Sequence, residues 1–122
     1  MILQTLPTNC GWKLFKIEGQ LDFASGPTIQ TAIAHIAGKG AGNVLVDVED
    51  VKTVDERGVN ALVSGVRQLL RQNPGVHVAF VARSRYLSQA LGKAEYPVAV
   101  PVYRHGVEAI RAIAPAGSHR AA

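Results

Sequence analysis

The chain has 122 residues, of which 48% are apolar and 18% are charged. This length suits one domain with a single core, and the apolar content excludes an intrinsically disordered chain. We therefore expect one folded domain over residues 1–122, with its core at about residues 12–114 and a disordered tail at residues 115–122.

The charge balance is basic, with a net charge of +4 and an isoelectric point of about 9.6. The basic residues are scattered, and the aromatic residues, 6% of the chain, do not alternate with them as they do in surfaces that stack nucleobases. We expect a mildly basic, solvated surface that suits an acidic protein partner, without direct nucleic-acid binding.

Several classes of site lack their sequence signals. No apolar run approaches the roughly 20 residues of a membrane helix, and the N-terminus lacks the pattern of a signal peptide. The single cysteine excludes an intramolecular disulfide and a thiol-rich metal cluster, and the four histidines lack metal-ligand spacing. No phosphate-binding glycine loop or nucleophile elbow occurs. We expect a cytoplasmic protein that is not an enzyme, with no cofactor, no metal and no membrane insertion.

In chain order, the first expected element is a strand from Trp12 to Ile17, which ends at Gly19 and continues in extended form to Phe23. A helix then begins at residues 25–27, where proline suits the first turn. A glycine-rich run at residues 38–42 ends this helix. The apolar stretch from residue 44 is typical of a central strand.

The best-defined element is the helix after Gly58, which we expect over residues 57–72. Its apolar residues recur at helical spacing and are Val59, Leu62, Val63, Val66, Leu69 and Leu70. The opposite stripe is polar and consists of Asn60, Ser64, Arg67 and Arg71. This division predicts an amphipathic helix with one buried face.

Shorter elements complete the chain. Residues 76–82 are expected to form a strand, and Ser84 to cap a short helix. Residues 98–100 are expected to form a short strand near an edge of the sheet, because Pro101 follows. A last helix over about residues 106–114 carries three apolar residues, Val107, Ile110 and Ile113. The alternation of strands and helices predicts an α/β architecture with a largely parallel sheet.

The junction between the central strand and the long helix has the strongest functional signal. Its sequence, Val-Lys-Thr-Val-Asp-Glu-Arg-Gly at residues 51–58, places two acids at the positive end of a helix dipole. Asp55 is expected to cap the helix by accepting hydrogen bonds from its first free N–H groups. Neighbouring residues of a helix do not face one another, so Asp55 and Glu56 are not expected to form a catalytic pair.

Two motifs together resemble the STAS domain, the fold of bacterial anti-sigma-factor antagonists. Residues 18–22, Glu-Gly-Gln-Leu-Asp, resemble the Gly-x-Leu-Asp turn that opens this domain. Residues 46–51, followed by Asp-Glu-Arg-Gly at 55–58, resemble its central strand and its Asp-Ser-x-Gly signature. The resemblance extends over about residues 13–112. It implies a STAS-like mixed sheet of four to five strands with about four helices layered on it.

The resemblance also implies a function. In this family the serine of the signature is the phosphorylation switch, and here that position is Glu56. The implied protein is a non-catalytic regulatory module whose partner is an anti-sigma factor with a serine-kinase-type ATP-binding fold. The implied partner-binding residues are Asp22, Val54, Asp55, Glu56, Arg57, Gly58, Asn60, Ser64 and Arg67. Because glutamate has no hydroxyl group, we expect no phosphorylation at residue 56.

Some alternatives stay open. Asp22 is either a turn residue that satisfies backbone N–H groups or an acidic neighbour of the same contact surface. Glu56, as a partial mimic of phosphoserine, either holds the protein in a weak-binding state or is bound directly by a basic site on the partner. The chain could instead be a STAS subunit of a transporter or of a signalling scaffold, or a small nucleotide-binding α/β protein. The oligomeric state stays open.

Overall fold

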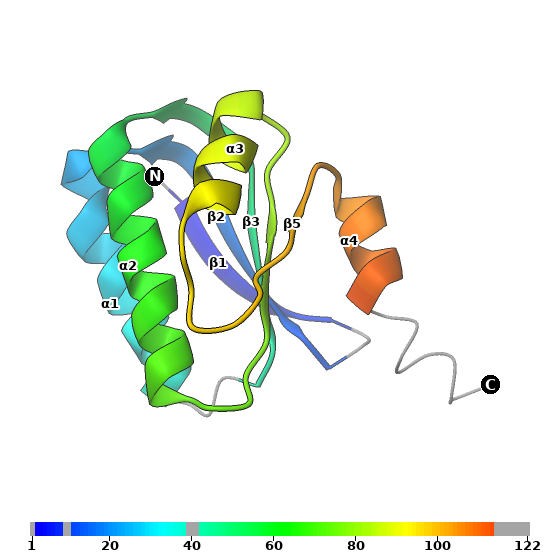
Figure 1. Ribbon diagram of the computed structural model, residues 1–122. Helices are drawn as coiled ribbons and strands as arrows, with labels where there is room; N and C mark the ends of the chain where they lie inside the picture. Colours follow the sequence, from blue (N-terminus) through cyan, green and yellow to red (C-terminus); the bar gives the residue numbers. More distant parts are fainter. Residues whose placement is uncertain (1, 9–10, 39–41, 114–122) are drawn as a thin grey trace.

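The computed structural model describes residues 2–8, 11–38 and 42–113 (Figure 1). The strands are β1 (Ile2–Pro7), β2 (Lys13–Leu21), β3 (Val44–Val54), β4 (Val78–Val81) and β5 (Val102–Tyr103). The helices are α1 (Gly26–Gly38), α2 (Glu56–Gln72), α3 (Arg85–Lys93) and α4 (Gly106–Ile113), with a short 3-10 helix, η1 (Phe23–Ser25), before α1. The expected α/β architecture, a mixed sheet of four to five strands with about four helices layered on it, is confirmed, with five strands in the described sheet.

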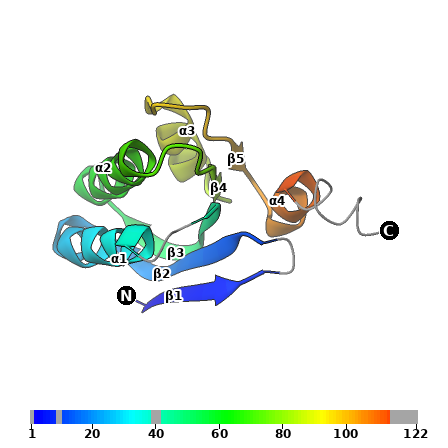
Figure 2. The ribbon, with the colours of Figure 1, turned by 90° about the horizontal axis from the view of Figure 1, so that it is seen from below.

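The strands lie in the sheet in the order of the chain, from β1 to β5. β1 pairs antiparallel with β2, and every other neighbouring pair is parallel. Because consecutive parallel strands are joined by right-handed crossovers, α1, α2 and α3 share one face of the sheet. Figure 2 shows these three helices together, with α4 apart from them on the other face.

The larger core lies between the sheet and the three helices. All six apolar residues expected on one face of α2 are buried there. α1 and α2 pack closely at Gly65. A Cβ atom added at this glycine of α2 would come within 2.7 Å of Ile33 Cδ1 in α1. The opposite stripe faces away, with Asn60, Ser64 and Arg71 exposed. The amphipathic division of this helix is therefore confirmed.

A smaller core lies on the other face, where Ala109 of α4 packs against β3 and β4 with the half-buried Ile113. The other two apolar residues of this helix, Val107 and Ile110, do not pack there, since their exposed fractions are 65% and 41%. Ala109 is fully buried instead. Its small side chain lets the backbone of α4 approach the sheet, which turns the larger residues outward.

The two edges of the sheet differ from the expectation. The folded part begins at Ile2 and not near residue 12, because β1 pairs with β2 along its whole length. Residues 98–100 are not a strand, and β5 follows Pro101 instead. Phe80 N donates to the Pro101 carbonyl at 2.9 Å, so pairing uses the acceptor that proline keeps. The expected edge position of this last strand is confirmed.

Some expectations fall on residues outside the described ranges: the turn at residues 39–41 and the tail at residues 115–122. Within the described ranges, none of the helices has the length and apolar composition needed to cross a membrane.

Candidate functional site

The junction between β3 and α2 is fixed by Asp55, which is the N-cap of α2. Its Oδ1 accepts a hydrogen bond from Gly58 N at 2.8 Å, which confirms the expected cap. The backbone N–H of Asp55 donates to the Leu21 carbonyl at 3.0 Å. The start of α2 is therefore tied to the end of β2.

Asp22, the next residue after β2, caps η1. Its Oδ1 accepts from Ser25 N at 3.0 Å, and its own backbone N–H donates to Ser25 Oγ at 2.8 Å. This reciprocal pair is a capping box. Asp22 is therefore a turn residue, which was one of the two alternatives. The turn also places Asp22 beside the start of α2.

Gly58 determines how closely the Asp22 turn and α2 approach. A Cβ atom added at Gly58 would overlap the Leu21 carbonyl and come within 2.5 Å of Asp22 N. No side chain fits between these backbones, so only glycine allows this packing. As a result, two segments that are more than 30 residues apart in the sequence form one continuous surface.

Phe23 is a part of this surface that the sequence analysis did not select. Its side chain is 66% exposed, and the Arg57 guanidinium carbon lies 5.0 Å from the centre of its ring. This is the geometry of a cation–π contact. The sequence contained a signal for this residue. Phe23 is a large aromatic residue directly after the Gly-x-Leu-Asp turn, a position where an exposed aromatic side chain can contact a partner.

Two concave regions flank the exposed side of α2. One, of about 380 Å³, lies between α1 and α2 beside Phe23 and Arg57. The other, of about 390 Å³, lies between α2 and α3, with Glu56 and the half-exposed Tyr86 on its rim. Asn60 and Ser64 line both regions and form the ridge between them. Exposed aromatic side chains beside apolar hollows are typical of protein-binding surfaces.

We use the name junction surface for the exposed or half-exposed side chains of Asp22, Phe23, Glu56, Arg57, Asn60 and Ser64. Val54, Asp55 and Gly58 support it from the end of β3 and the first turn of α2. Arg67, also expected at the site, lies further along α2, where its Nε donates to the Glu95 carbonyl at 2.6 Å. The structure thus brings eight of the nine predicted residues together at the junction, and Arg67 lines the hollow between α2 and α3 with Asn60 and Ser64.

The groups whose pKa values shift lie away from this surface. Burial raises the pKa of Asp47 on β3, whereas a hydrogen bond from Lys16 lowers the pKa of Asp50. Burial also raises the pKa of Tyr96 to about 12. In the described part of the chain, no group of three or more His, Cys, Asp or Glu side chains is arranged to hold a metal ion.

The comparison with known protein families identifies the family to which this fold belongs. The model of the STAS domain matches residues 4–109. The chain belongs to the STAS domain family. No curated protein matches it.

Solved structures with this fold include anti-sigma factor antagonists. The unphosphorylated anti-sigma factor antagonist SpoIIAA has a TM-score of 0.66 at 16% identity, over 92% of this chain and 97% of that chain. An anti-sigma factor antagonist from Mycobacterium paratuberculosis has a TM-score of 0.67 at 16% identity, over 92% of each chain. A serine-to-glutamate variant of RsbS from Moorella thermoacetica has a TM-score of 0.63 at 15% identity, over 92% of this chain and 97% of that chain.

Proposed function

We propose that this STAS domain is a non-catalytic regulatory module that acts in the cytoplasm as an anti-sigma-factor antagonist. Its partner is an anti-sigma factor with a serine-kinase-type ATP-binding fold, and it docks through the junction surface. Membership of the STAS family and the fold shared with anti-sigma factor antagonists support this proposal. Binding of this partner releases a sigma factor by partner exchange.

The observation that carries the proposal is the close contact of Gly58 with the backbone of Leu21 and Asp22. It holds the turn and the helix start as one rigid unit, together with the hydrogen bond from Asp55 N to the Leu21 carbonyl. A partner that binds a preorganised surface loses less free energy in ordering it. The exposed Phe23 beside a hollow supplies an apolar anchor of the kind that dominates protein interfaces.

Glu56 determines how this module is regulated. It is exposed in the first turn of α2, where the helix dipole favours an anion. Its carboxylate has a charge of −1, whereas phosphoserine has a charge of about −1.5 to −2 and three acceptor oxygens. Glu56 is therefore a partial and permanent mimic of a phosphorylated residue. We favour a partner whose basic site binds this glutamate directly, because a regulator that never binds has little use.

Phosphorylation tests this proposal directly. The wild-type chain, incubated with the anti-sigma factor kinase and ATP, is expected to gain no phosphate in an intact-mass measurement, whereas Glu56→Ser is expected to gain one. The nearest hydroxyl groups on either side, Thr53 in β3 and Ser64 in α2, are exposed and serve as internal controls. Stoichiometric phosphorylation of the wild type within residues 53–64 would contradict the proposal.

A STAS subunit of a transporter or of a signalling scaffold is the second candidate. The fixed charge of Glu56 favours it, because a permanent assembly needs no phosphorylation switch. Titration calorimetry with the purified anti-sigma factor separates the two. Saturable binding that is weakened by a charge reversal, Glu56→Lys, supports the antagonist. Absence of binding, together with co-purification of a transporter or scaffold subunit, supports the second candidate.

A further inference from the structure

The strand β1 forms a free edge of the sheet. Nothing pairs with it on the side away from β2 in the described part of the chain. Its six residues pair with β2 without a register shift, so the edge contains no bulge. The other edge, β5, has only two residues and contacts both α3 and α4. Long, regular edge strands are templates for pairing with another chain unless the sequence blocks them.

The sequence of β1 does not block its edge. Its residues, Ile-Leu-Gln-Thr-Leu-Pro, include no charged side chain, although charged residues are the common protection of a free edge. Ile2 and Leu6 are 54% and 42% exposed. They point to the face opposite α1, because Leu3 and Thr5, which alternate with them, line the α1 side. The edge is thus uncharged and open, with two exposed apolar side chains.

We propose that β1 pairs antiparallel with β1 of a second copy of this chain, about a twofold axis at Gln4. About this residue the apolar Ile2 and Leu6 are related to each other, whereas Leu3 is related to Thr5. In that register Ile2 lies opposite Leu6 of the second copy, and Gln4 lies opposite Gln4. Directly opposite residues share a face of the sheet, so the exposed apolar side chains meet one another. Pro7, which has no N–H to donate, falls outside the paired segment.

The absence of charged side chains in β1 favours a second copy of this chain as the pairing partner. In the proposed register Gln4 lies opposite Gln4 of the second copy, so a charged residue at this position would repel its symmetry mate. The absence of charge between Ile2 and Pro7 removes this cost. A twofold contact is also closed, because both copies use the same edge, and β1 is the long free edge of the sheet within the described residues. The result is a dimer with one continuous ten-stranded sheet rather than an open fibre.

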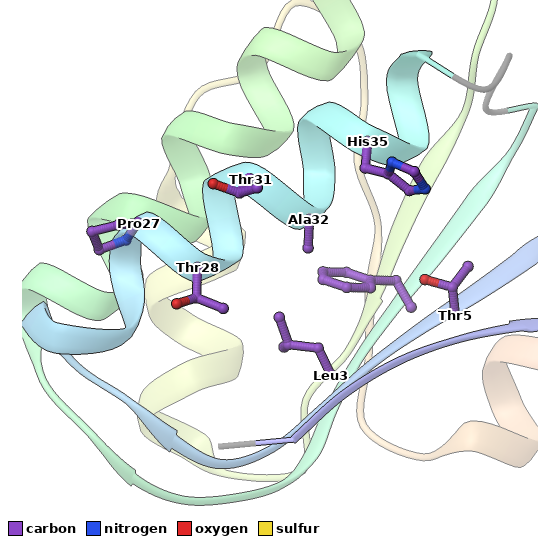
Figure 3. A pocket seen from close by; sticks show the side chains of 8 residues that line it. Leu3, Thr5, Pro27, Thr28, Thr31, Ala32 and His35 are labelled. Atoms are coloured by element: carbon purple, nitrogen blue, oxygen red, sulfur yellow. The ribbon is translucent and has the colours of Figure 1, made fainter.

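A groove beside β1 supports the same occupant. It has a volume of about 580 Å³, and it lies between Leu3 and Thr5 of β1 and Thr28, Thr31 and His35 of α1 (Figure 3). A twofold axis perpendicular to the sheet would place α1 of the second copy on the same face. The two grooves would then meet above the paired β1 strands and cover each other. Figure 2 shows α1 between β1 and α2, so the paired edge and α2 lie on opposite sides of α1.

The test is the mass of the chain in solution by light scattering. We expect the wild type to have twice the mass of one chain, which is 13.0 kDa. Gln4→Lys and Gln4→Glu, which each place like charges at the twofold axis, are each expected to be monomers. An equimolar mixture of these two variants is expected to restore the dimer. Gln20→Lys is the matched control, since Gln20 is an exposed residue of the interior strand β2, and it is expected to stay dimeric.

Three results would overturn this inference. One is a single-chain mass for the wild type at concentrations up to about 1 mM. Another is a dimer that persists in Gln4→Lys. The third is a mixture of folded Gln4→Lys and Gln4→Glu chains, verified by circular dichroism, that stays monomeric. The mixing experiment separates the proposed pairing from general damage, because each variant supplies the charge that the other lacks.

Discussion

The helices α2 and α3 begin in the same way but form different surfaces. Each follows a parallel strand, β3 or β4, at the same end of the sheet. Asp55 caps α2 by accepting from Gly58 N at 2.8 Å, and Ser84 caps α3 by accepting from Leu87 N at 3.1 Å. In both cases the donor is the third residue of the helix.

The third residue makes the difference. In α3 it is Leu87, which fills the core with a side chain that is 1% exposed. In α2 it is Gly58, and the missing side chain lets the backbone of Leu21 and Asp22 come into contact with the helix. A capped helix start alone, as in α3, therefore forms no such surface. In α2 the glycine three residues after the cap lets the Asp22 turn contact the helix, and the two segments together form the junction surface.

The largest expected effect comes from adding one methyl group at two helical glycines. Gly58→Ala should lower the free energy of unfolding by about 1–3 kcal/mol or more, because the new Cβ overlaps the Leu21 carbonyl. Gly92→Ala in α3 meets only Val102 Cγ2 at 4.0 Å and should raise it by about 0.5–1 kcal/mol. Urea denaturation of both variants measures this contrast. A loss of similar size in both would remove the special role of Gly58.

The aromatic anchor is expected to have the next largest effect. Phe23→Ala should weaken binding of the anti-sigma factor by about 2 kcal/mol if Phe23 is a hot spot, while stability changes by about 0.5–1 kcal/mol through loss of the contact with Arg57. Val98→Ala, at an exposed apolar residue outside the surface, is the control and should leave affinity unchanged. Equal affinities for all three proteins would place the anchor elsewhere.

Removing the two caps should separate stability from binding. Asp55→Ala and Ser84→Ala should each cost about 1 kcal/mol of stability, because each leaves a first-turn N–H without its acceptor. Only Asp55→Ala should also weaken binding of the partner, since only the start of α2 belongs to the junction surface. Thermal melts and titration calorimetry on the same preparations provide both values. An affinity loss in Ser84→Ala that matches the loss in Asp55→Ala would contradict the difference between the two helices.

The smallest expected effect concerns the strands before the two helices. β3 contains Asp47 opposite Val81 of β4, and burial raises the pKa of Asp47. A raised pKa in the folded state adds stability below the unfolded pKa of about 3.9, and this stability is lost as the pH rises through the folded value. Asp47→Asn, which keeps an acceptor for Glu49 N, should therefore be more stable than the wild type at neutral pH. Urea melts should show that this advantage fades in acid; an advantage independent of pH would exclude the ionised carboxylate as its cause.

The features that sequence reasoning predicted correctly depend on short-range physics. The buried face of α2 follows from its helical period, and the caps Asp55 and Ser84 act within one turn. The family came from the resemblance of two short motifs, and the STAS domain model matches residues 4–109.

The features that it missed depend on contacts between distant segments. β1 is an edge strand in which only Leu3 packs against the core, so its burial pattern gives little alternation to detect. The outward turn of Val107 and Ile110 depends on where α4 sits on the sheet. The exposure of Phe23 depends on the contact of Gly58 with the Asp22 turn, which joins segments that no local pattern connects.

Hydrogen–deuterium exchange with and without the purified anti-sigma factor tests the central claim, that the junction surface is the docking site. The account predicts slower exchange at residues 22–25 and 54–64 in the complex, and no added protection at residues 84–93, where the equally capped α3 begins. Protection of the α3 start, without any at the two segments of the junction surface, would contradict the account.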